Sequence, residues 1–375
     1  MKVLHVISGG DSGGAKTSVI KLLKELADIG VTVKLICFIK GDFYQEVTRQ
    51  GIDCELIPQK SRFDLSVLKR LSYIIQNDGY DLINAHGARA NFILALIKKR
   101  IKVPLITTVH SDYKHDFDHH QLKRIVFTFL NAYSLKKMTA YITMAEDFRN
   151  IMVDRGFDKN KIHVAYNGVN EDRITSESTP EVFFGQYGVV YDPAYTYIGI
   201  ASRLHPVKGV DVFLRGAKAA IAVNPNLRFV IAGFGDDKYE QMYKTYVIEN
   251  NLVNVIYFIG FVENIYDFYN CIDVNVNSSH TEAVCYALLE GSMFKKPTIA
   301  SRVGGTVELI EDNIDGLLFD DNDSEMLSQH IVTLANDRAL RVKLGNQLFE
   351  KVIQKFTTRA MGERYLQIYQ LLERN

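Results

Sequence analysis

The sequence predicts two α/β domains, each built on a parallel β-sheet. At 375 residues the chain exceeds the roughly 250–300 residues at which a single hydrophobic core stops growing. Short, almost continuously apolar segments alternate with stretches of helical periodicity, and a polar segment without periodicity interrupts this alternation near the middle. Strands that are apolar on both faces indicate a parallel sheet with helices covering each side.

The expected strands fall into two series separated by that polar segment. The first series comprises residues 3–7, 31–39, 54–57, 82–85, 105–109, 141–143 and 162–165, and the second comprises 197–201, 229–232, 255–259, 274–276, 298–300 and 317–319. We therefore expect a first domain at residues 1–170, a linker at 171–194 and a second domain at 195–356. The last helix, at about residues 357–375, is expected to pack back on the first domain.

The formal net charge is zero, but the charges are unevenly divided along the chain. Residues 1–170 hold 25 Lys and Arg against 17 Asp and Glu (+8), which leaves 19 against 27 (−8) for residues 171–375. A basic first half favours an anionic surface, such as a bilayer leaflet or a phosphate-bearing acceptor, although solvated helix faces explain any single cation better. The candidate cations are Lys98, Lys99, Arg100, Lys102, Lys123, Arg124, Lys136 and Lys137.

Composition indicates an ordinary soluble protein, with 47% hydrophobic and 23% charged residues. The four cysteines, Cys37, Cys54, Cys271 and Cys285, show no paired spacing, so we interpret them as reduced packing residues. The apolar start is too short for a signal peptide, and no apolar run reaches the ~18 residues of a membrane span. We expect a cytoplasmic protein whose contact with a membrane, if any, is peripheral.

Polar loops follow the strands of the second series, where open parallel sheets bind ligands. Arg203 and Lys208 stand five residues apart in a loop that leads into a helix. Two cations beside a helix N-terminus suit a diphosphate without metal. A surface loop with two solvated cations is an equally good interpretation of these residues alone. In the next loop, Gly233 and Gly235 permit a close backbone approach.

Two acids, Glu282 and Glu290, flank a segment that follows another strand. If this segment were wholly helical, eight residues would span ~12 Å, which is the order of the distance from a nucleotide ribose across a diphosphate to a sugar. Glu290 could then bind ribose hydroxyls while Glu282 binds hydroxyls of the sugar. The alternative is a helix with two acids, one of them paired with Lys295 or Lys296.

Together these motifs resemble the signature of the family 4 (group 1) retaining glycosyltransferases. The resemblance rests on Arg203 with Lys208, Gly233 with Gly235, Glu282 with Glu290, and the segment 301–308 that contains Gly304 and Gly305; in the first half it includes Gly13-Gly14, the segment 107–110 and the segment 167–169. It covers nearly the whole chain. It implies the GT-B fold, in which two Rossmann-like parallel-sheet domains face a central cleft, with the acceptor bound by the first domain and the nucleotide-sugar by the second.

The resemblance also implies roles for single residues. Arg203 and Lys208 would neutralise the donor diphosphate in place of a metal, Glu290 would bind ribose, and Glu282 would bind sugar hydroxyls, while His110 would lie beneath the transferred sugar. Other donor-binding positions implied are Gly13, Gly14, Gly233, Gly235, Phe261, Val262, Ala283, Val284, Cys285, Gly304 and Gly305, and the acceptor-side positions are Ser12, His86 and Asp112. Neither a cofactor nor a metal is expected.

The implied reaction is transfer of a sugar, with retention of configuration, from a nucleotide diphosphate to a glycan or lipid-linked acceptor. We expect a UDP-sugar donor, a hexosyltransferase acting in cell-surface polysaccharide biosynthesis, and no nucleic-acid partner. Ala283 and Cys285 stand where family members commonly have Gly and Pro, so the donor sugar is left open.

Three alternatives compete with this interpretation. Residues 10–17 differ by one substitution, Ala15 for Gly, from the phosphate-binding loop of P-loop NTPases. A dinucleotide-binding oxidoreductase fits less well, because the early glycines do not match its spacing. A non-catalytic partner subunit is the third, and retention of all four charged residues argues against it. His115, His119 and His120 lack the further ligands of a metal site.

Overall fold

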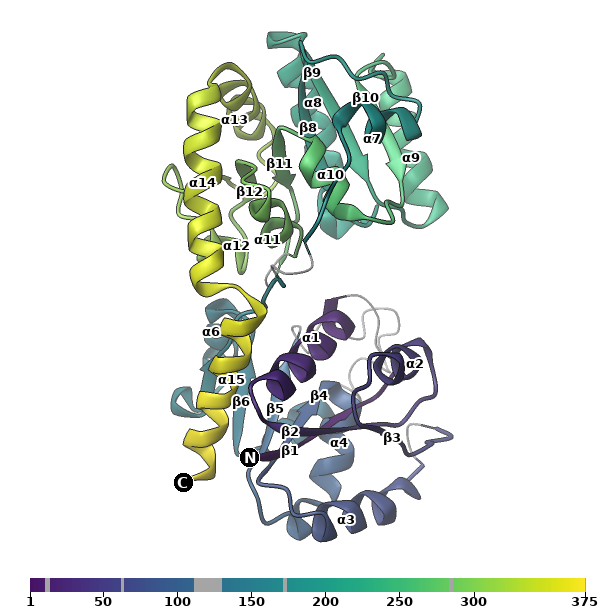
Figure 1. The fold of residues 1–375 in the computed structure, drawn as a ribbon, viewed down its shortest axis with the longest axis vertical. Helices are drawn as coiled ribbons and strands as arrows, with labels where there is room; N and C mark the ends of the chain where they lie inside the picture. Colours follow the sequence, from purple (N-terminus) through teal and green to yellow (C-terminus); the bar gives the residue numbers. More distant parts are fainter. Residues whose placement is uncertain (11–13, 62–63, 111–129, 171–173, 283–285, 375) are drawn as a thin grey trace. The chain divides into compact units, whose positions relative to one another are not determined.

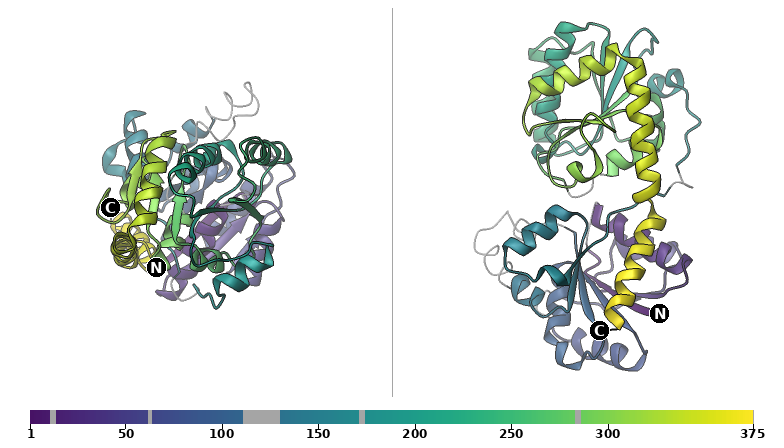
Figure 2. Two further views of the ribbon diagram at one scale, coloured as in Figure 1. Left: turned by 90° about the horizontal axis from the view of Figure 1, so that it is seen from above. Right: turned by 90° about the vertical axis from the view of Figure 1, so that its left-hand side faces the viewer.

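The computed structural model describes residues 1–10, 14–61, 64–110, 130–170, 174–282 and 286–374 (Figure 1). The chain divides into two compact units, one formed by Met1–Gly168 with Thr358–Asn375 and the other by Val169–Thr357. Each unit is built on one sheet whose strand pairings are all parallel. Helices lie on both faces of each sheet (Figure 2).

The sheet of the first unit has seven strands in the order β3-β2-β1-β4-β5-β6-β7. Its strands are β1 (Lys2–Ile7), β2 (Thr32–Cys37), β3 (Cys54–Leu56), β4 (Leu82–His86), β5 (Leu105–Val109), β6 (Ala140–Thr143) and β7 (Ile162–Val164). Its helices are α1 (Gly14–Asp28), α2 (Asp42–Arg49), α3 (Val67–Asn77), α4 (Gly87–Leu96), α6 (Glu146–Asp154) and α15 (Thr358–Glu373), with short 3-10 turns η1 (Lys98–Arg100) and η2 (Lys159–Lys161).

The sheet of the second unit has six strands in the order β10-β9-β8-β11-β12-β13. Its strands are β8 (Thr196–Ala201), β9 (Leu227–Ala232), β10 (Ile256–Gly260), β11 (Val274–Asn277), β12 (Thr298–Ser301) and β13 (Leu317–Phe319). Its helices are α7 (Pro180–Gln186), α8 (Val210–Val223), α9 (Asp237–Glu249), α10 (Ile265–Cys271), α11 (Tyr286–Met293), α12 (Thr306–Leu309), α13 (Ser324–Asn336) and α14 (Arg338–Lys355), with the 3-10 turn η4 (Pro206–Lys208).

The prediction of two parallel-sheet α/β folds is confirmed. Each expected strand is present, and its ends shift by no more than two residues. Apolar runs locate these strands well because both faces of each sheet are covered, so almost every side chain of strands such as β1, β4 and β9 is buried.

The segment expected to be a linker, residues 171–194, differs from that expectation because it contains α7. Thr179 caps this helix by accepting a hydrogen bond from the Val182 amide (3.5 Å), and Pro180 occupies its first turn. Phe183 and Phe184 are buried in the core of the second unit. A seven-residue helix is too short to show periodicity, so this part of the second unit could not be recognised.

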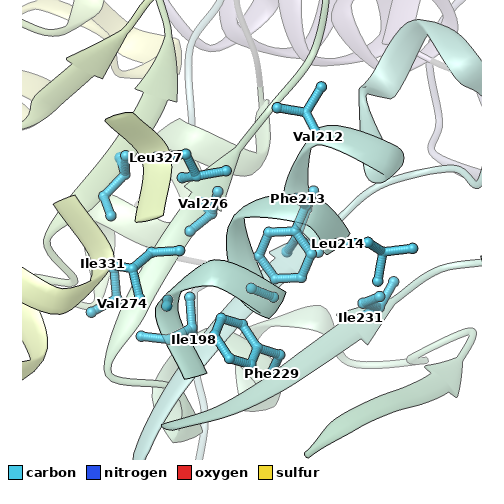
Figure 3. Close-up of a cluster of buried hydrophobic side chains, with 14 of the residues drawn as sticks. Ile198, Val212, Phe213, Leu214, Phe229, Ile231, Val274, Val276, Leu327 and Ile331 are labelled. Atoms are coloured by element: carbon cyan, nitrogen blue, oxygen red, sulfur yellow. The ribbon is translucent and has the colours of Figure 1, made fainter. Parts of the chain in front are cut away.

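The main core of the second unit lies between the sheet and helices α8 and α13, which pack against each other on one face of the sheet (Figure 3). Phe213 of α8 meets Phe229 of β9 edge to face, with ring centroids 5.8 Å apart. Leu327 and Ile331 come from α13, and Val276 comes from β11. This packing fixes the start of α8 relative to the end of β11, where the predicted donor residues lie.

The last helix, α15, packs against α1 and the sheet of the first unit. Tyr365 and Tyr369 are both fully buried there. The Asn84 side chain on β4 donates a hydrogen bond to the Tyr369 hydroxyl (2.8 Å), which ties the end of the chain to the centre of the sheet. The neighbouring strands β2 and β3 bring Cys37 and Cys54 together, with 3.7 Å between their sulfurs, a proximity that their spacing along the chain did not indicate.

Candidate functional site

Each sheet has one point at which the order of its strands reverses. In the first unit it lies between β1 and β4, and in the second between β8 and β11. Connections on the two sides of such a point leave in opposite directions and open a crevice beyond the carboxyl ends of the strands, where ligands bind. His86 ends β4 and His110 follows β5, whereas Lys208 and Glu282 come from the loops after β8 and β11.

Lys208 and Glu282 form an ion pair across the switch point of the second sheet. Lys208 ends the turn η4 after β8, and Glu282 lies in the loop after β11. The pair is largely withdrawn from solvent, since 19% of the Lys208 side chain and 9% of the Glu282 side chain are exposed. Desolvation strengthens the attraction between opposite charges, and it also makes either charge costly without a partner.

Two further side chains hold the Glu282 carboxylate. The Ser279 hydroxyl donates to Oε1 (2.7 Å), and the Asn277 side-chain amide lies 3.5 Å from the same oxygen. Asn277 also accepts a hydrogen bond from the Ser279 amide (3.1 Å), which tightens the turn between them. The carboxylate is therefore fixed by neutral donors as well as by Lys208.

Glycines allow the loops around this pair to contact each other through their backbones. Gly209 directly precedes α8 with φ 58°, and a Cβ there would overlap the carbonyl oxygen of Ser278. The Ser278 hydroxyl donates to the Gly209 carbonyl (2.8 Å), so the two loops are also joined by a hydrogen bond. Gly233 and Gly235 approach the carbonyl groups of Ser202 and Leu204 in the same way. Their close backbone contact is with the neighbouring loop, and a contact with donor stays a prediction.

Gly304 and Gly305 support the Glu282 loop from the other side. Gly304 has φ 45°, and a Cβ there would overlap the Glu282 carbonyl oxygen. The Gly305 amide donates to the same oxygen (3.0 Å). Only glycine fits at position 304, because a side chain would meet both the left-handed backbone and this carbonyl.

Arg203 differs from Lys208 in its surroundings. It is exposed after β8, and within the described residues its guanidinium forms no ion pair. Phe261, which follows β10, is 69% exposed, and its ring meets that of Phe234 edge to face with centroids 5.9 Å apart. Val262 is buried, which suits a backbone contact better than a side-chain contact, and Glu290 is partly buried on α11.

The first unit brings His110 against His86. Their ring nitrogens, His86 Nδ1 and His110 Nε2, are 3.1 Å apart, and His86 Nε2 lies 3.0 Å from Nδ1 of His5 on β1. Burial lowers the pKa of His110 to about 4 and that of His5 to about 3, while burial and both neighbours hold the pKa of His86 well below its ordinary value. His86 is 1% exposed with both nitrogens engaged, so the structure does not favour the predicted acceptor contact for it.

Several predicted residues lie outside the described part of the chain. These are Ser12, Gly13, Asp112, Ala283, Val284 and Cys285, together with Lys123, Arg124, His115, His119 and His120. Gly14 is the first residue of α1. Within the described residues, no group of three or more His, Cys, Asp or Glu side chains is arranged to hold a metal ion.

Five of the candidate cations of the first half lie at the amino end of its sheet. Lys99, Arg100 and Lys102 are exposed before β5, and Lys136 and Lys137 are exposed before β6. His110 follows the carboxyl end of β5, so the length of this five-residue strand, about 17 Å at ~3.3 Å per residue, separates the two ends. No helix in the described part of the chain is both long and apolar enough to cross a bilayer.

Sequence reasoning missed Asn277 and Ser279 as holders of Glu282, and His5 as a partner of His86. Asn277 and Ser279 gave a usable signal, because polar residues in an otherwise apolar strand end are seldom buried without a partner. His5 gave none, since one histidine inside a strand is usually a core residue.

Two family models match the chain in succession. The model described as Glycosyltransferase Family 4 matches residues 12–173, and the model described as Glycosyl transferases group 1 matches residues 192–351. The chain belongs to the group 1 glycosyltransferases. This membership confirms the predicted family and the predicted hexosyltransferase-type enzyme. It leaves the P-loop, oxidoreductase and non-catalytic interpretations without support.

This glycosyltransferase resembles proteins from distant organisms over most of its length. It is 26% identical over 341 residues to the glycosyltransferase MJ1178 of Methanocaldococcus jannaschii, covering 89% of this chain and 88% of that protein. It is 25% identical over 292 residues to the UDP-Gal:alpha-D-GlcNAc-diphosphoundecaprenol alpha-1,3-galactosyltransferase of Escherichia coli, covering 76% and 73%. The crystal structure of Anabaena Alr3699/HepE in complex with UDP superposes with a TM-score of 0.85 at 20% identity, covering 99% of this chain and 100% of that one. The predicted GT-B fold is thereby confirmed.

Proposed function

We propose that this glycosyltransferase moves a sugar from a uridine diphosphate donor to a glycan or lipid-linked acceptor, with retention of configuration. The observation that carries the proposal is the Lys208–Glu282 ion pair at the switch point of the second sheet. Lys208 suits the donor diphosphate and Glu282 suits hydroxyls of the transferred sugar. Because the two are paired, donor binding exchanges one set of charge-assisted hydrogen bonds for another and never requires an isolated buried charge.

Arg203 supplies the second cation of the proposed diphosphate site. Its exposed position after β8 and before α8 leaves the guanidinium available to an anion. With Lys208 and the start of α8, it would stabilise the departing diphosphate as charge develops on it, without a metal ion. Glu290 on α11 would bind the ribose, and the backbone at Phe261 and Val262 would contact the base.

The related proteins favour a uridine nucleotide and a lipid-linked acceptor. The Escherichia coli relative is named for UDP-Gal and for a diphosphoundecaprenol-linked substrate. The Anabaena protein has been solved with UDP and with UDP-glucose. We carry both preferences over to this chain and, with them, a role in building cell-surface polysaccharide.

A panel of nucleotides tests the donor site by thermal unfolding. UDP and UDP-sugars should stabilise the protein most, by about 2.7 kcal/mol at a ligand concentration of 100 Kd, and EDTA should leave this shift unchanged. Lys208→Ala should weaken UDP binding about 10- to 150-fold, from the 1.5–3 kcal/mol of a charged hydrogen bond. Lys218→Ala, at an exposed site on the following helix α8, is the matched control. Stabilisation by ATP with magnesium alone would restore the P-loop interpretation, and a UDP shift abolished by EDTA would remove the metal-free one.

The stereochemical outcome is tested on the product. In this proposal the acceptor hydroxyl attacks the face from which the diphosphate leaves, so an α-linked donor sugar gives an α-linked product. Proton NMR of the purified product reads the anomeric configuration directly. A β-linked product would refute retention while leaving the proposed donor site intact.

We also propose that the basic residues before β5 and β6 bind the anionic face of a membrane. Lys99, Lys102 and Lys136 are exposed at one end of the sheet, which suits a flat anionic surface. Flotation with vesicles should show binding that rises with the fraction of anionic lipid and falls with salt. Replacing these three lysines by Gln should abolish flotation, whereas the same change at Lys218 and Lys238 should not. Flotation that ignores lipid charge would contradict this contact.

A further inference from the structure

Three histidines of the first unit form a continuous chain on one face of its sheet. His5 on β1 is paired in register with Asn84 on β4, and His86 on β4 is paired with Thr108 on β5. Alternate residues of a strand share a face, so His5, His86 and His110 all lie on the face that α15 covers. The rings of His5 and His86 are stacked with centroids 5.3 Å apart, and those of His86 and His110 are 5.4 Å apart.

Both contacts in this chain join the Nδ1 of one histidine to the Nε2 of the next. His5 Nδ1 lies 3.0 Å from His86 Nε2, and His86 Nδ1 lies 3.1 Å from His110 Nε2. Burial lowers the pKa of each ring, so all three are neutral at pH 7 and each carries one N–H. A hydrogen bond needs one N–H and one lone pair.

Only two arrangements of the three protons satisfy both contacts. Either every ring carries its proton on Nδ1, or every ring carries it on Nε2. Any mixture sets two N–H groups or two lone pairs against each other. The tautomer of His110 is therefore coupled to that of His5 through His86, which lies between them in the chain of hydrogen bonds.

The atoms at the two ends of the chain decide between the arrangements. His5 Nε2 and His110 Nδ1 are buried and have no hydrogen-bond partner among the described residues. His5 Nε2 lies in the core of the unit, whereas His110 follows the carboxyl end of β5, where a bound ligand can accept its N–H. A buried N–H without a partner is rarer than a bare lone pair. The lone pair therefore belongs on His5 Nε2, which places every proton on Nδ1.

We propose that His5 and His86 are positioning residues that hold His110 as a neutral imidazole with its Nδ1–H directed at a substrate oxygen. The inference rests on the proposed function and on the place beneath the transferred sugar that the family resemblance implies for His110. A fixed neutral donor can bind a sugar hydroxyl or phosphate oxygen without carrying a positive charge itself. Without the chain, His110 would divide its population between two tautomers, one of which presents a lone pair to that oxygen.

Nitrogen-15 NMR of the wild-type protein tests the tautomers independently of catalysis. Long-range proton–nitrogen correlations distinguish Nδ1–H from Nε2–H rings, and loss of signals in His5→Asn and His110→Asn identifies their owners. At pH 7 all three rings should be Nδ1–H tautomers. Three Nε2–H rings would overturn the donor role of His110, and mixed tautomers would overturn the coupling. Either result stands even if the proposed donor or acceptor is wrong.

Kinetics of two His5 variants test the consequence for the reaction. His5→Leu removes the donor to His86 and should lower kcat about 2- to 12-fold, the worth of one neutral hydrogen bond of 0.5–1.5 kcal/mol, with the KM for donor unchanged. His5→Asn places an amide donor near the position of Nδ1 and should recover most of that loss. If both variants lose kcat in proportion to their loss of stability, His5 acts only through packing and the proposal is refuted. UDP binding by the second unit should be unaffected in each variant, which separates this failure from failure of the donor site.

Discussion

Replacing Lys208 by Met tests whether the Lys208–Glu282 ion pair contributes to UDP binding, to the stability of the second unit, or to both. The Glu282 side chain is 9% exposed, and among the described residues it would keep its neutral donors, Ser279 and Asn277. Leaving a fully buried charge unpaired costs about 3–5 kcal/mol, and breaking an exposed pair costs about 0–1 kcal/mol. Because the pair is mostly buried and two donors remain, we expect Lys208→Met to destabilise the second unit by about 2–3 kcal/mol.

This loss of stability should appear in thermal unfolding of the full chain. A change of 1 kcal/mol shifts Tm by about 2–4 °C for a unit of 150–250 residues, so Lys208→Met should lower the Tm of the second unit by about 4–12 °C. The double variant Lys208→Met/Glu282→Gln leaves no unpaired charge and should recover most of this shift. Lys218→Met, on the exposed side of α8, should leave Tm unchanged.

Binding and stability should then separate. The double variant should unfold close to the wild-type temperature yet bind UDP as weakly as Lys208→Met, because the diphosphate still lacks its cation. Recovery of UDP affinity in the double variant would show that Lys208 acts only by neutralising Glu282. Additive Tm losses in the double variant would refute the ion pair itself.

Two further predictions concern a glycine and the buried histidines. Gly304→Ala should displace the Glu282 loop and lower kcat/KM at least ~10-fold. This kinetic effect comes in addition to the loss of stability, about 1–2 kcal/mol, that a left-handed alanine causes. Gly188→Ala has a similar positive φ with open space at Cβ and is the matched control, so equal effects of the two on activity would contradict the overlap. His5 and His110 have lowered pKa values in the folded state, so the unfolded chain binds more protons between about pH 6.5 and pH 4. Stability should be constant above pH 7 and fall on acidification by up to ~1.4 kcal/mol per pH unit for each histidine, and a Tm that stays flat from pH 7 to pH 5 would contradict their burial as neutral rings.

The sequence by itself determined where the strands lie and which loops carry charge. Both follow from local patterns, because an apolar run predicts a buried strand and the residue after it must lie at the edge of the sheet. Arg203, Lys208 and Glu282 were found in this way, and the order of the motifs pointed to the family. The short helix around Phe183 and Phe184 escaped because seven residues carry too little periodicity.

Only the tertiary structure decided which side chains meet. Ser279 and Asn277 hold Glu282 because the loop after β11 turns back on itself, and His5 reaches His86 because β1 and β4 are neighbours in register. The glycines of the second unit proved to be needed for contacts between loops. The exposed cations before β5 and β6 proved to lie at the opposite end of the first sheet from His110. Such pairings depend on strand order and register, which are set by packing over the whole unit and leave no local trace in the chain.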